Sequence, residues 1–256
     1  MKTSIGFIGG GRITKIFLQG FKKAGLEFES VKVFEPNSET LSNLQKSFPE
    51  IEKAESAEAA ATQKVVFVAV HPPVVMETLQ KIKDTVTEST VVISLAPKIT
   101  LEKMASVLPT KKLVRVIPNA TSFINEGFNP VSFYPGFEGK EQKSVFKLLK
   151  ILGKTIVTEE AKLEGYAMVS AMLPTYFWFQ WNETEKLALE MGLTPEEAKT
   201  AVNSTLKKAL KLYYKSGLTP EQVMDLIPVK PIGENEAEIK NILNTKLLGL
   251  YGKIKP

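Results

Sequence analysis

The sequence contains no cysteine and a single histidine, His71, among its 256 residues. Without cysteine there can be no disulfide, thiol nucleophile or cysteine-ligated metal, and the composition is compatible with a reducing compartment. One histidine excludes a histidine-rich metal site, and also a Ser-His-Asp triad built on any other histidine, so we predict no bound metal. No hydrophobic run approaches the length that crosses a bilayer, and the first residues lead directly into a strand. We therefore expect a cytoplasmic protein that does not associate with membranes.

Charge of one sign is not concentrated anywhere in the chain either. The 33 lysines and arginines exceed the 28 aspartates and glutamates only slightly, and lysine pairs are interleaved with acidic residues. This distribution is typical of solvated faces rather than of a nucleic-acid groove, so we predict no nucleic-acid partner. A hydrophobic content of 43% in a chain of this length is enough for two globular cores.

What the sequence does have is a glycine-rich turn close to its N-terminus. Residues 5–14 read Ile-Gly-Phe-Ile-Gly-Gly-Gly-Arg-Ile-Thr, a pattern typical of a buried strand, a turn and the start of a helix. A dinucleotide site needs Gly9 for the tight turn and Gly11 for the close approach of a pyrophosphate to the helix N-terminus. Thr14 stands in the place of a third glycine.

The residues after the turn favour a dinucleotide site over a plain structural turn. The helical pattern ends at Gly25 and a strand follows at 31–34, which completes a β-α-β unit. The side chain of Arg12 either contacts a phosphate or faces solvent. Through this turn we expect the cofactor to be held by Ile8, Gly9, Gly10, Gly11, Arg12 and Ile13.

Glu35 directly follows the second strand of this unit. An acidic side chain here accepts hydrogen bonds from the adenosine ribose, and its charge repels the extra phosphate of NADP. Glu35 therefore mildly favours NADH over NADPH. The alternative is an exposed acid ahead of a helix whose N-cap is Asn37, which we also count among the cofactor-binding candidates.

Strands and helices alternate over the first 158 residues. Continuous apolar runs with β-branched residues predict central strands of a parallel sheet, and short links join them to helices. The pattern predicts an α/β Rossmann-type, doubly wound and mostly parallel sheet, whose ligands bind off the carboxyl ends of the strands. The predicted strands are residues 5–8, 31–34, 65–70, 90–95, 112–117, 128–134 and 153–158.

Beyond the last of these strands the pattern is helical only. We divide the chain into a dinucleotide-binding domain, 1–158, and an all-α substrate and dimerisation domain, 159–256. Thr194 and Thr219 each precede Pro-Glu, which predicts two capped helix starts. The run at 176–181, Tyr-Phe-Trp-Phe-Gln-Trp, is aromatic on all sides of a helix, which indicates a helix at a dimer interface or core packing within one subunit.

Four blocks occur in a fixed order: Ile-Gly-Phe-Ile-Gly-Gly-Gly at 5–11, Phe-Val-Ala-Val-His-Pro at 67–72, Val-Ile-Ser-Leu-Ala at 92–96 and Val-Arg-Val-Ile-Pro-Asn at 114–119. Together with Pro174-Thr-Tyr176, these blocks make the chain resemble the pyrroline-5-carboxylate reductases, the NAD(P)H enzymes that make proline. The resemblance runs over essentially the whole chain.

This resemblance implies further site residues and an assembly. The cofactor, NADPH or NADH, would also contact Ser56, Ala69, Val70, His71, Pro72 and Ala96. The substrate would lie between the nicotinamide and the helical domain, near Asn119, Pro174, Gly233, Glu234 and Asn235. The C-terminal helices would intertwine with those of a second subunit, which gives a homodimer or a higher oligomer.

The substrate half departs from the family's pattern. Where the family has a Ser-Pro-Gly-Gly-Thr-Thr loop, residues 229–235 read Val-Lys-Pro-Ile-Gly-Glu-Asn, so Glu234 brings a negative charge toward a substrate carboxylate. Met172 stands where the family has a small residue, which narrows the pocket, and His71 replaces a lysine. His71 is the one residue near the expected nicotinamide that exchanges a proton near neutral pH, and we assign no catalytic residue.

The expected activity is hydride transfer from NADH or NADPH to a cyclic imine, with 1-pyrroline-5-carboxylate as the substrate and proline as the product. Because the imine arrives protonated, the protein can catalyse by positioning it and excluding water. Two alternatives stay open: reduction of a different imine or ketone on the same scaffold, and a dinucleotide-binding homologue without catalysis.

Overall fold

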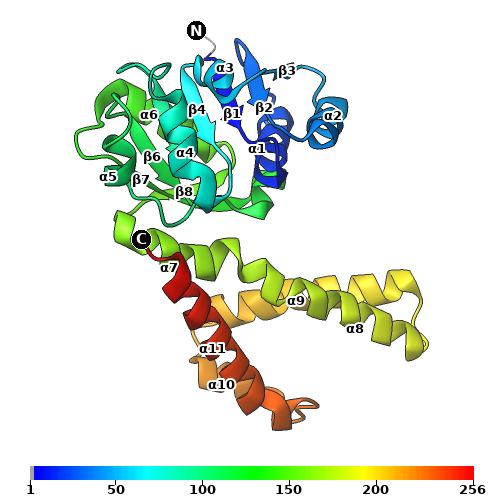
Figure 1. Cartoon of the computed structure of the whole chain (residues 1–256). Helices are drawn as coiled ribbons and strands as arrows, with labels where there is room; N and C mark the ends of the chain where they lie inside the picture. The colour runs from blue at the N-terminus through cyan, green and yellow to red at the C-terminus, as the bar shows by residue number, and fades with distance from the viewer. Residues whose placement is uncertain (1–2) are drawn as a thin grey trace. The chain divides into compact units, whose positions relative to one another are not determined.

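The computed structural model describes residues 3–256, which fall into two compact units (Figure 1). The first unit comprises the chain up to Ala171 together with Tyr251–Pro256, and the second comprises Met172–Leu250. Compactness divides the chain after Ala171 because Leu163 and Ala167 pack against Ile117 of the first unit. The functional boundary at 158/159 stays a prediction.

An eight-stranded sheet forms the centre of the first unit. In sheet order its strands are β3 (Glu52–Lys53), β2 (Val31–Phe34), β1 (Ile5–Ile8), β4 (Val65–Val68), β5 (Val91–Ser94), β6 (Leu113–Val116), β7 (Gly127–Phe133) and β8 (Gly153–Val157). All neighbouring strands are parallel except β6 and β7. The order reverses at β1, which pairs with β2 on one side and β4 on the other, and such a reversal opens a crevice for ligands.

Helices cover both faces of the sheet because successive strand residues point to opposite faces. Phe7 and Phe67 face the layer of α1 (Arg12–Lys23), α2 (Ser38–Ser47) and α6 (Gly139–Lys150). Val66 and Val92 face the layer of α3 (Ala57–Ala61), α4 (Pro72–Ile82) and α5 (Leu101–Ala105). The rings of Phe7 and Phe67 stack with centroids 4.7 Å apart, which packs β1 against β4 at the reversal. The predicted doubly wound, mostly parallel sheet is thus confirmed.

Strands β3 and β4 differ from what the sequence pattern predicted. Strand β3 was not predicted because its two residues are polar and exposed, so it has no apolar run or alternation. The apolar run at 65–70 forms a strand only as far as Val68, and its last two residues, Ala69 and Val70, belong to the loop that follows. This shift places both residues at the carboxyl edge of the sheet.

After β8 the first unit is completed by helical segments. They are η2 (Glu160–Lys162), α7 (Leu163–Tyr166) and the π-helical η3 (Ala167–Ala171). One further segment, the 3₁₀ helix η1 (Ala120–Ile124), lies between β6 and β7. Ile254, from the returning segment, packs with Ile117 and Ala171 in a small apolar cluster.

The second unit is helical throughout. It contains η4 (Leu173–Tyr176), α8 (Trp178–Glu190), α9 (Pro195–Lys215), α10 (Pro220–Asp225), η5 (Gly233–Asn235) and most of α11 (Glu236–Ile254). The predicted starts at Thr194 and Thr219 are confirmed as complete capping boxes. No helix among residues 3–256 is both long and apolar enough to cross a bilayer.

Few side chains of the second unit are buried. Within Met172–Leu250, all of which is described, only Ala188 and Ala198 are buried. Phe177, Trp178 and Phe179 of the aromatic run are exposed, so the alternative that they form a core within one chain is wrong.

Candidate functional site

A cavity of about 820 Å³ lies at the carboxyl edge of the sheet, where β1, β4 and β5 end. Its walls come from the glycine turn after β1, the loops after β4 and β5, and the facing sides of α1 and α2. This size and position are typical of a cofactor site in a doubly wound fold. The lining residues are Gly10, Gly11, Arg12, Ile13, Lys15, Ile16, Thr40, Asn43, Leu44, Ala69, Val70, His71, Pro72, Leu95, Ala96 and Pro97.

The turn after β1 is closed by backbone contacts that require glycine. Gly9 has a φ of +105°, and a Cβ there would lie 2.6 Å from the carbonyl oxygen of Ala69. Its N–H donates to the carbonyl of Phe34 at 2.8 Å. The hydroxyl of Thr14 donates to the Gly9 carbonyl at 2.5 Å. Thr14 is completely buried, so it fits the third glycine position because its hydroxyl is bonded to the turn itself.

Gly11 differs from Gly9 because a Cβ on it would meet no atom within 4 Å. Gly11 lines the cavity and is the N-cap of α1, which has no side-chain cap and no acidic residue in its first turn. Free N–H groups at a helix N-terminus carry partial positive charge and bind anions. The exposed Arg12 adds a full positive charge at the same end of the cavity. These residues fit a pyrophosphate.

The carboxylate of Glu35 joins the glycine turn to the start of α2. One oxygen accepts the N–H of Gly10 at 2.8 Å, and the other accepts the N–H of Asn37 at 2.9 Å. A Cβ on Gly10 would lie 2.8 Å from the Cβ of Glu35, so this contact also requires glycine. Glu35 thus orders the turn, a role that the sequence pattern did not indicate. A carboxylate has about four lone-pair positions, so its oxygens retain acceptor capacity for a ribose hydroxyl.

The loops after β4 and β5 supply the opposite wall. Residues 69–72 and Ala96 all line the cavity, as the sequence resemblance implied. The Ala69 N–H donates to the carbonyl of Ile8 at 2.8 Å, which carries the strand pairing into the loop. His71 is exposed and is the N-cap of α4, but its side chain makes no capping hydrogen bond.

Five of the predicted cofactor residues shape the surroundings and do not line the cavity: Ile8, Gly9, Glu35, Asn37 and Ser56. Ile8 is buried at the end of β1. The side chain of Asn37 caps α2 by accepting the Thr40 N–H at 2.8 Å, and that of Ser56 caps α3 by accepting the Ala59 N–H at 3.2 Å. Their contact with a cofactor stays a prediction.

Asn119, a predicted substrate residue, is buried after β6 and uses both ends of its amide within the fold. Its oxygen accepts the N–H and the hydroxyl of Thr121 at 3.0 and 2.8 Å. Its nitrogen donates to the carbonyl of Ser170 at 3.2 Å. In an α-helix that carbonyl would accept an N–H from residue 174, but Pro174 has none. Asn119 therefore supplies a donor that the chain lacks.

The other substrate candidates, Gly233, Glu234 and Asn235, form the 3₁₀ segment η5 in the second unit. The N–H of Gly233 donates to the carbonyl of Lys230 at 2.9 Å, and that of Asn235 donates to the carbonyl of Ile232 at 3.1 Å. The side chains of Glu234 and Asn235 are exposed. Among the described residues, no cluster of three or more histidine, cysteine, aspartate or glutamate side chains suits a metal.

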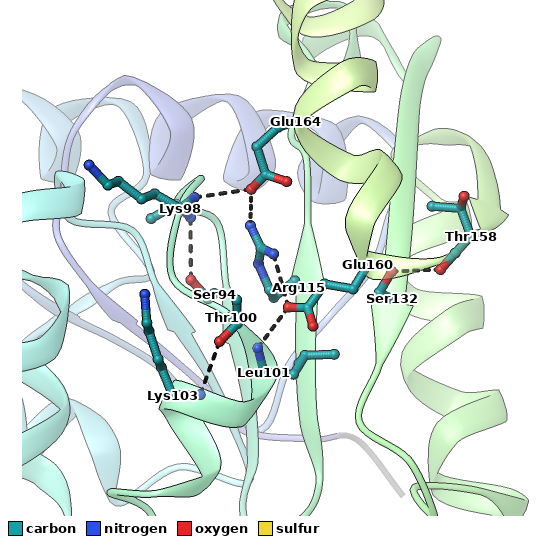
Figure 2. A network of polar contacts seen from close by, with 11 residues as sticks. Ser94, Lys98, Thr100, Leu101, Lys103, Arg115, Ser132, Thr158, Glu160 and Glu164 are labelled. Carbon is teal, nitrogen blue, oxygen red and sulfur yellow. Dashed lines mark hydrogen bonds and ion pairs between the residues drawn. The ribbon is translucent and has the colours of Figure 1, made fainter. Parts of the chain in front are cut away.

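An ionic network near the loop after β5 was missed from the sequence (Figure 2). Arg115 of β6 is 1% exposed and lies between two carboxylates. Its Nη1 donates to Glu160 at 2.9 Å and its Nη2 donates to Glu164. The signal was a charged residue inside the apolar run Leu-Val-Arg-Val-Ile, because a buried charge needs a partner.

Comparisons with known proteins agree with this arrangement. A family model described as NADP oxidoreductase, coenzyme F420-dependent, matches residues 4–98, which include the glycine turn and the loops after β4 and β5. The pyrroline-5-carboxylate reductase of Pasteurella multocida is 27% identical over 214 residues, which cover 82% of this chain and 78% of that protein. The pyrroline-5-carboxylate reductase of Corynebacterium melassecola is 22% identical over 253 residues, 97% of this chain and 93% of that protein.

A solved structure extends the likeness over both units. The crystal structure of Plasmodium falciparum pyrroline carboxylate reductase with NADP bound has a TM-score of 0.76 and 19% identity, and the match covers 98% of this chain and 94% of that one. At an identity this low, the structural match shows a shared fold and no more. Sequence relatives and fold together lead to one conclusion: the chain is similar to pyrroline-5-carboxylate reductases over nearly its whole length and shares their fold.

Proposed function

We propose that the protein is an NAD(P)H-dependent reductase of a cyclic imine, with 1-pyrroline-5-carboxylate as the substrate and proline as the product. The observation that carries this proposal is the cavity at the carboxyl edge of the sheet, in which the open Gly11 and the uncapped start of α1 fit a pyrophosphate. The named activity of the relatives supplies the substrate.

The residues of the first unit would hold the cofactor by its two polar parts. The backbone N–H groups at the start of α1 and the guanidinium of Arg12 would bind the pyrophosphate. The carboxylate of Glu35 would accept the ribose hydroxyl and repel the extra phosphate of NADP, which favours NADH. When bound, the reduced nicotinamide supplies a hydride to the carbon of the C=N bond.

The rest of the wall is suited to excluding water. Leu95 and Ala96 are buried and Ala69 and Val70 are half buried, so they present apolar surface to the cavity. As the carbon gains the hydride, the π electrons of the C=N bond become the nitrogen lone pair, and a nitrogen that arrives protonated keeps its proton. The protein then needs no acid, and its residues act by orienting the substrate and keeping the site dry.

We also propose that the second unit pairs with a second copy of the chain. Phe179, Tyr214 and Leu248, on α8, α9 and α11, are each about two thirds exposed or more, at 66%, 71% and 66%. Apolar side chains exposed over several helices of one unit favour a protein interface. An interface between copies, formed by these helices, supports a homodimer.

Reduction of a different imine or ketone is the second candidate. It is favoured by Glu234, whose exposed carboxylate lies in the segment where the family holds a substrate carboxylate. A substrate without a carboxylate would avoid this repulsion.

The test is oxidation of NADH and of NADPH by the purified protein, followed by loss of cofactor absorbance. Turnover with 1-pyrroline-5-carboxylate supports the proposal, provided that Gly11→Ala strongly reduces it at NADH concentrations near the native KM. If the protein binds NADH without turning over this substrate, cyclic imines and ketones that lack a carboxylate should be assayed next. Activity on those would support the second candidate, and binding without any turnover would indicate a non-catalytic homologue.

A further inference from the structure

The guanidinium of Arg115 is bonded to two carboxylates, and each carboxylate is bonded in turn to one backbone N–H (Figure 2). Glu164 Oε1 accepts from Arg115 Nη2 and also from the N–H of Lys98, the latter at 3.0 Å. Glu160 Oε1 accepts from Arg115 Nη1 at 2.9 Å and from the N–H of Leu101 at 2.7 Å. The N–H of Lys98 belongs to the loop that runs from β5 to α5, and Leu101 is the first residue of α5. The network thus connects β6 and the helical segment after β8 to this loop.

The same loop forms part of the cofactor cavity. Leu95, Ala96 and Pro97 line it, and Lys98 comes next in the chain. Lys98 has a φ of +76°, a left-handed conformation that residues other than glycine rarely adopt. Such a conformation persists only where neighbouring contacts hold it, and the Glu164 bond to the Lys98 N–H is such a contact.

Stability alone is a poor explanation for the network. Arg115 and Glu164 are both 1% exposed, so their charges have lost almost all contact with water. Arg115 Nε and Glu164 Oε2 have no hydrogen-bond partner among the described residues. Apolar residues of similar volume often replace buried ion pairs without loss of stability. The ion pair of Arg115 and Glu164 therefore has a role other than stability, one that depends on its hydrogen bonds and that apolar side chains would not fill.

We propose that Glu164 is a positioning residue for the cofactor site, and that Arg115 holds its carboxylate against the loop at 95–101. The bond to Lys98 fixes the left-handed turn and so places Leu95, Ala96 and Pro97 as a wall of the cavity. Glu160 does the same for the start of α5 through Leu101. This inference rests on the proposed function for the identity of the cofactor.

We assume that the cofactor binds only when the loop at 95–101 is held in the position seen in the structure. Without the Glu164–Lys98 hydrogen bond, fewer molecules have the loop in that position, and the apparent affinity for the cofactor falls in proportion to their fraction. The variant that tests this removes both charges together, Arg115→Met with Glu164→Leu, so that no unpaired charge is left between them. We expect its melting temperature to stay close to that of the native protein. We expect its dissociation constant for NADH to rise about tenfold, and KM for NADH to rise with it while kcat changes less.

Hydrogen exchange tests the tether, the hydrogen bond from the Lys98 N–H to the Glu164 carboxylate, without any cofactor. Exchange at the Lys98 N–H should be about tenfold faster in the double variant, because its acceptor is gone. Adding Lys98→Gly to the double variant should recover most of the NADH affinity, since glycine adopts the left-handed conformation without help. The control is Glu141→Gln, which breaks the surface ion pair with Lys112 at the other end of β6 and should change neither quantity.

Unchanged exchange at Lys98 together with unchanged NADH affinity in a folded double variant would overturn the inference. If the double variant does not fold, Glu160→Ala decides, because Glu160 is 29% exposed and its loss should speed exchange at Leu101 but not at Lys98. Failure of native protein to reduce any imine would contradict the proposed function but not this inference, because exchange and NADH binding are measured without turnover. If native protein does not bind NADH at all, exchange alone decides whether the tether exists.

Discussion

The side-chain amide of Asn119 donates to the carbonyl oxygen of Ser170 at 3.2 Å, which joins the end of β6 to the π-helical segment after α7. Ser170 precedes Pro174 by one helical turn, so this carbonyl has lost its helical donor to the proline. Asn119, which the sequence predicted to contact substrate, thus donates the hydrogen bond that Pro174 cannot donate to the Ser170 carbonyl. Asn119 and Pro174 both belong to motifs of the family resemblance.

Asn119→Asp should lower the free energy of unfolding by about 1–3 kcal/mol, because the donor facing Ser170 becomes an acceptor while the cap on Thr121 is kept. Urea denaturation monitored by circular dichroism measures this. In a Pro174→Ala background the chain regains its own N–H, so the same substitution should cost less. An equal cost in both backgrounds would show that Asn119 does not compensate for the proline.

Gly11→Ala should weaken NADH binding about a hundredfold and leave the melting temperature unchanged, because the added methyl enters open space where a phosphate would lie. Gly9→Ala is the contrasting variant. It should cost about 1–3 kcal/mol of stability, because φ is +105° and the Cβ would meet the Ala69 carbonyl. Calorimetric titration and thermal melting separate the two effects. Full NADH affinity in Gly11→Ala would place the pyrophosphate elsewhere.

Glu35→Gln should shift the ratio of NADPH to NADH affinity about tenfold toward NADPH, because it removes the charge that repels the extra phosphate. Glutamine can still accept the Gly10 N–H, so the turn should stay ordered. Glu35→Ser should raise the same ratio but also weaken binding of both cofactors, since its shorter side chain loses the hydrogen bonds to both Gly10 and Asn37. If neither variant changes the ratio, Glu35 does not face the ribose.

Replacement of Phe179 and Tyr214 by glutamate should convert the protein to monomers, because charges would enter the proposed interface between copies. Light scattering after size exclusion reports the mass directly. Val157→Glu alters a side chain of the first unit that is 61% exposed, and it should leave the mass unchanged. A native protein that is already monomeric at micromolar concentration would refute the dimer.

Stability in acid should depend on the capping box of α9. The N–H of Thr194 donates to the Glu197 carboxylate and holds the pKa of that carboxyl below its usual value of 4.5. A lowered pKa in the folded state stabilises the fold above the usual value, and the stabilisation is lost as the pH falls through the lowered one. Below pH 4.5, the melting temperature of native protein should approach that of Glu197→Gln. A constant difference between them would contradict this role.

The sequence predicted those parts of the fold that are determined by residues close together in the chain. The alternation of apolar runs and helical patterns gave the sheet, and Thr194 and Thr219 gave two helix starts, because period and capping act within a few residues. The turn after β1 was recognisable for the same reason: the conformation of Gly9 depends on the absence of a Cβ.

Pairings between distant segments were not predictable in this way. Glu35 was read as a ribose ligand, yet its bond to Gly10 depends on how β1 and β2 meet. The partners of Arg115 lie in a helical segment that the sequence could not orient. The N–H of the left-handed Lys98 donates to a carboxylate 66 residues away in the chain. Each case requires the register of a packed sheet, which a single sequence does not supply.

The scarcity of buried side chains in Met172–Leu250 affects how the protein melts. Helices that bury little of their apolar surface gain little free energy by folding alone, so their persistence depends on association. Under the proposed pairing of copies, heat absorption by this part of the chain moves to higher temperature as protein concentration rises. The sheet, whose core is complete within one chain, would unfold at a temperature that dilution does not alter.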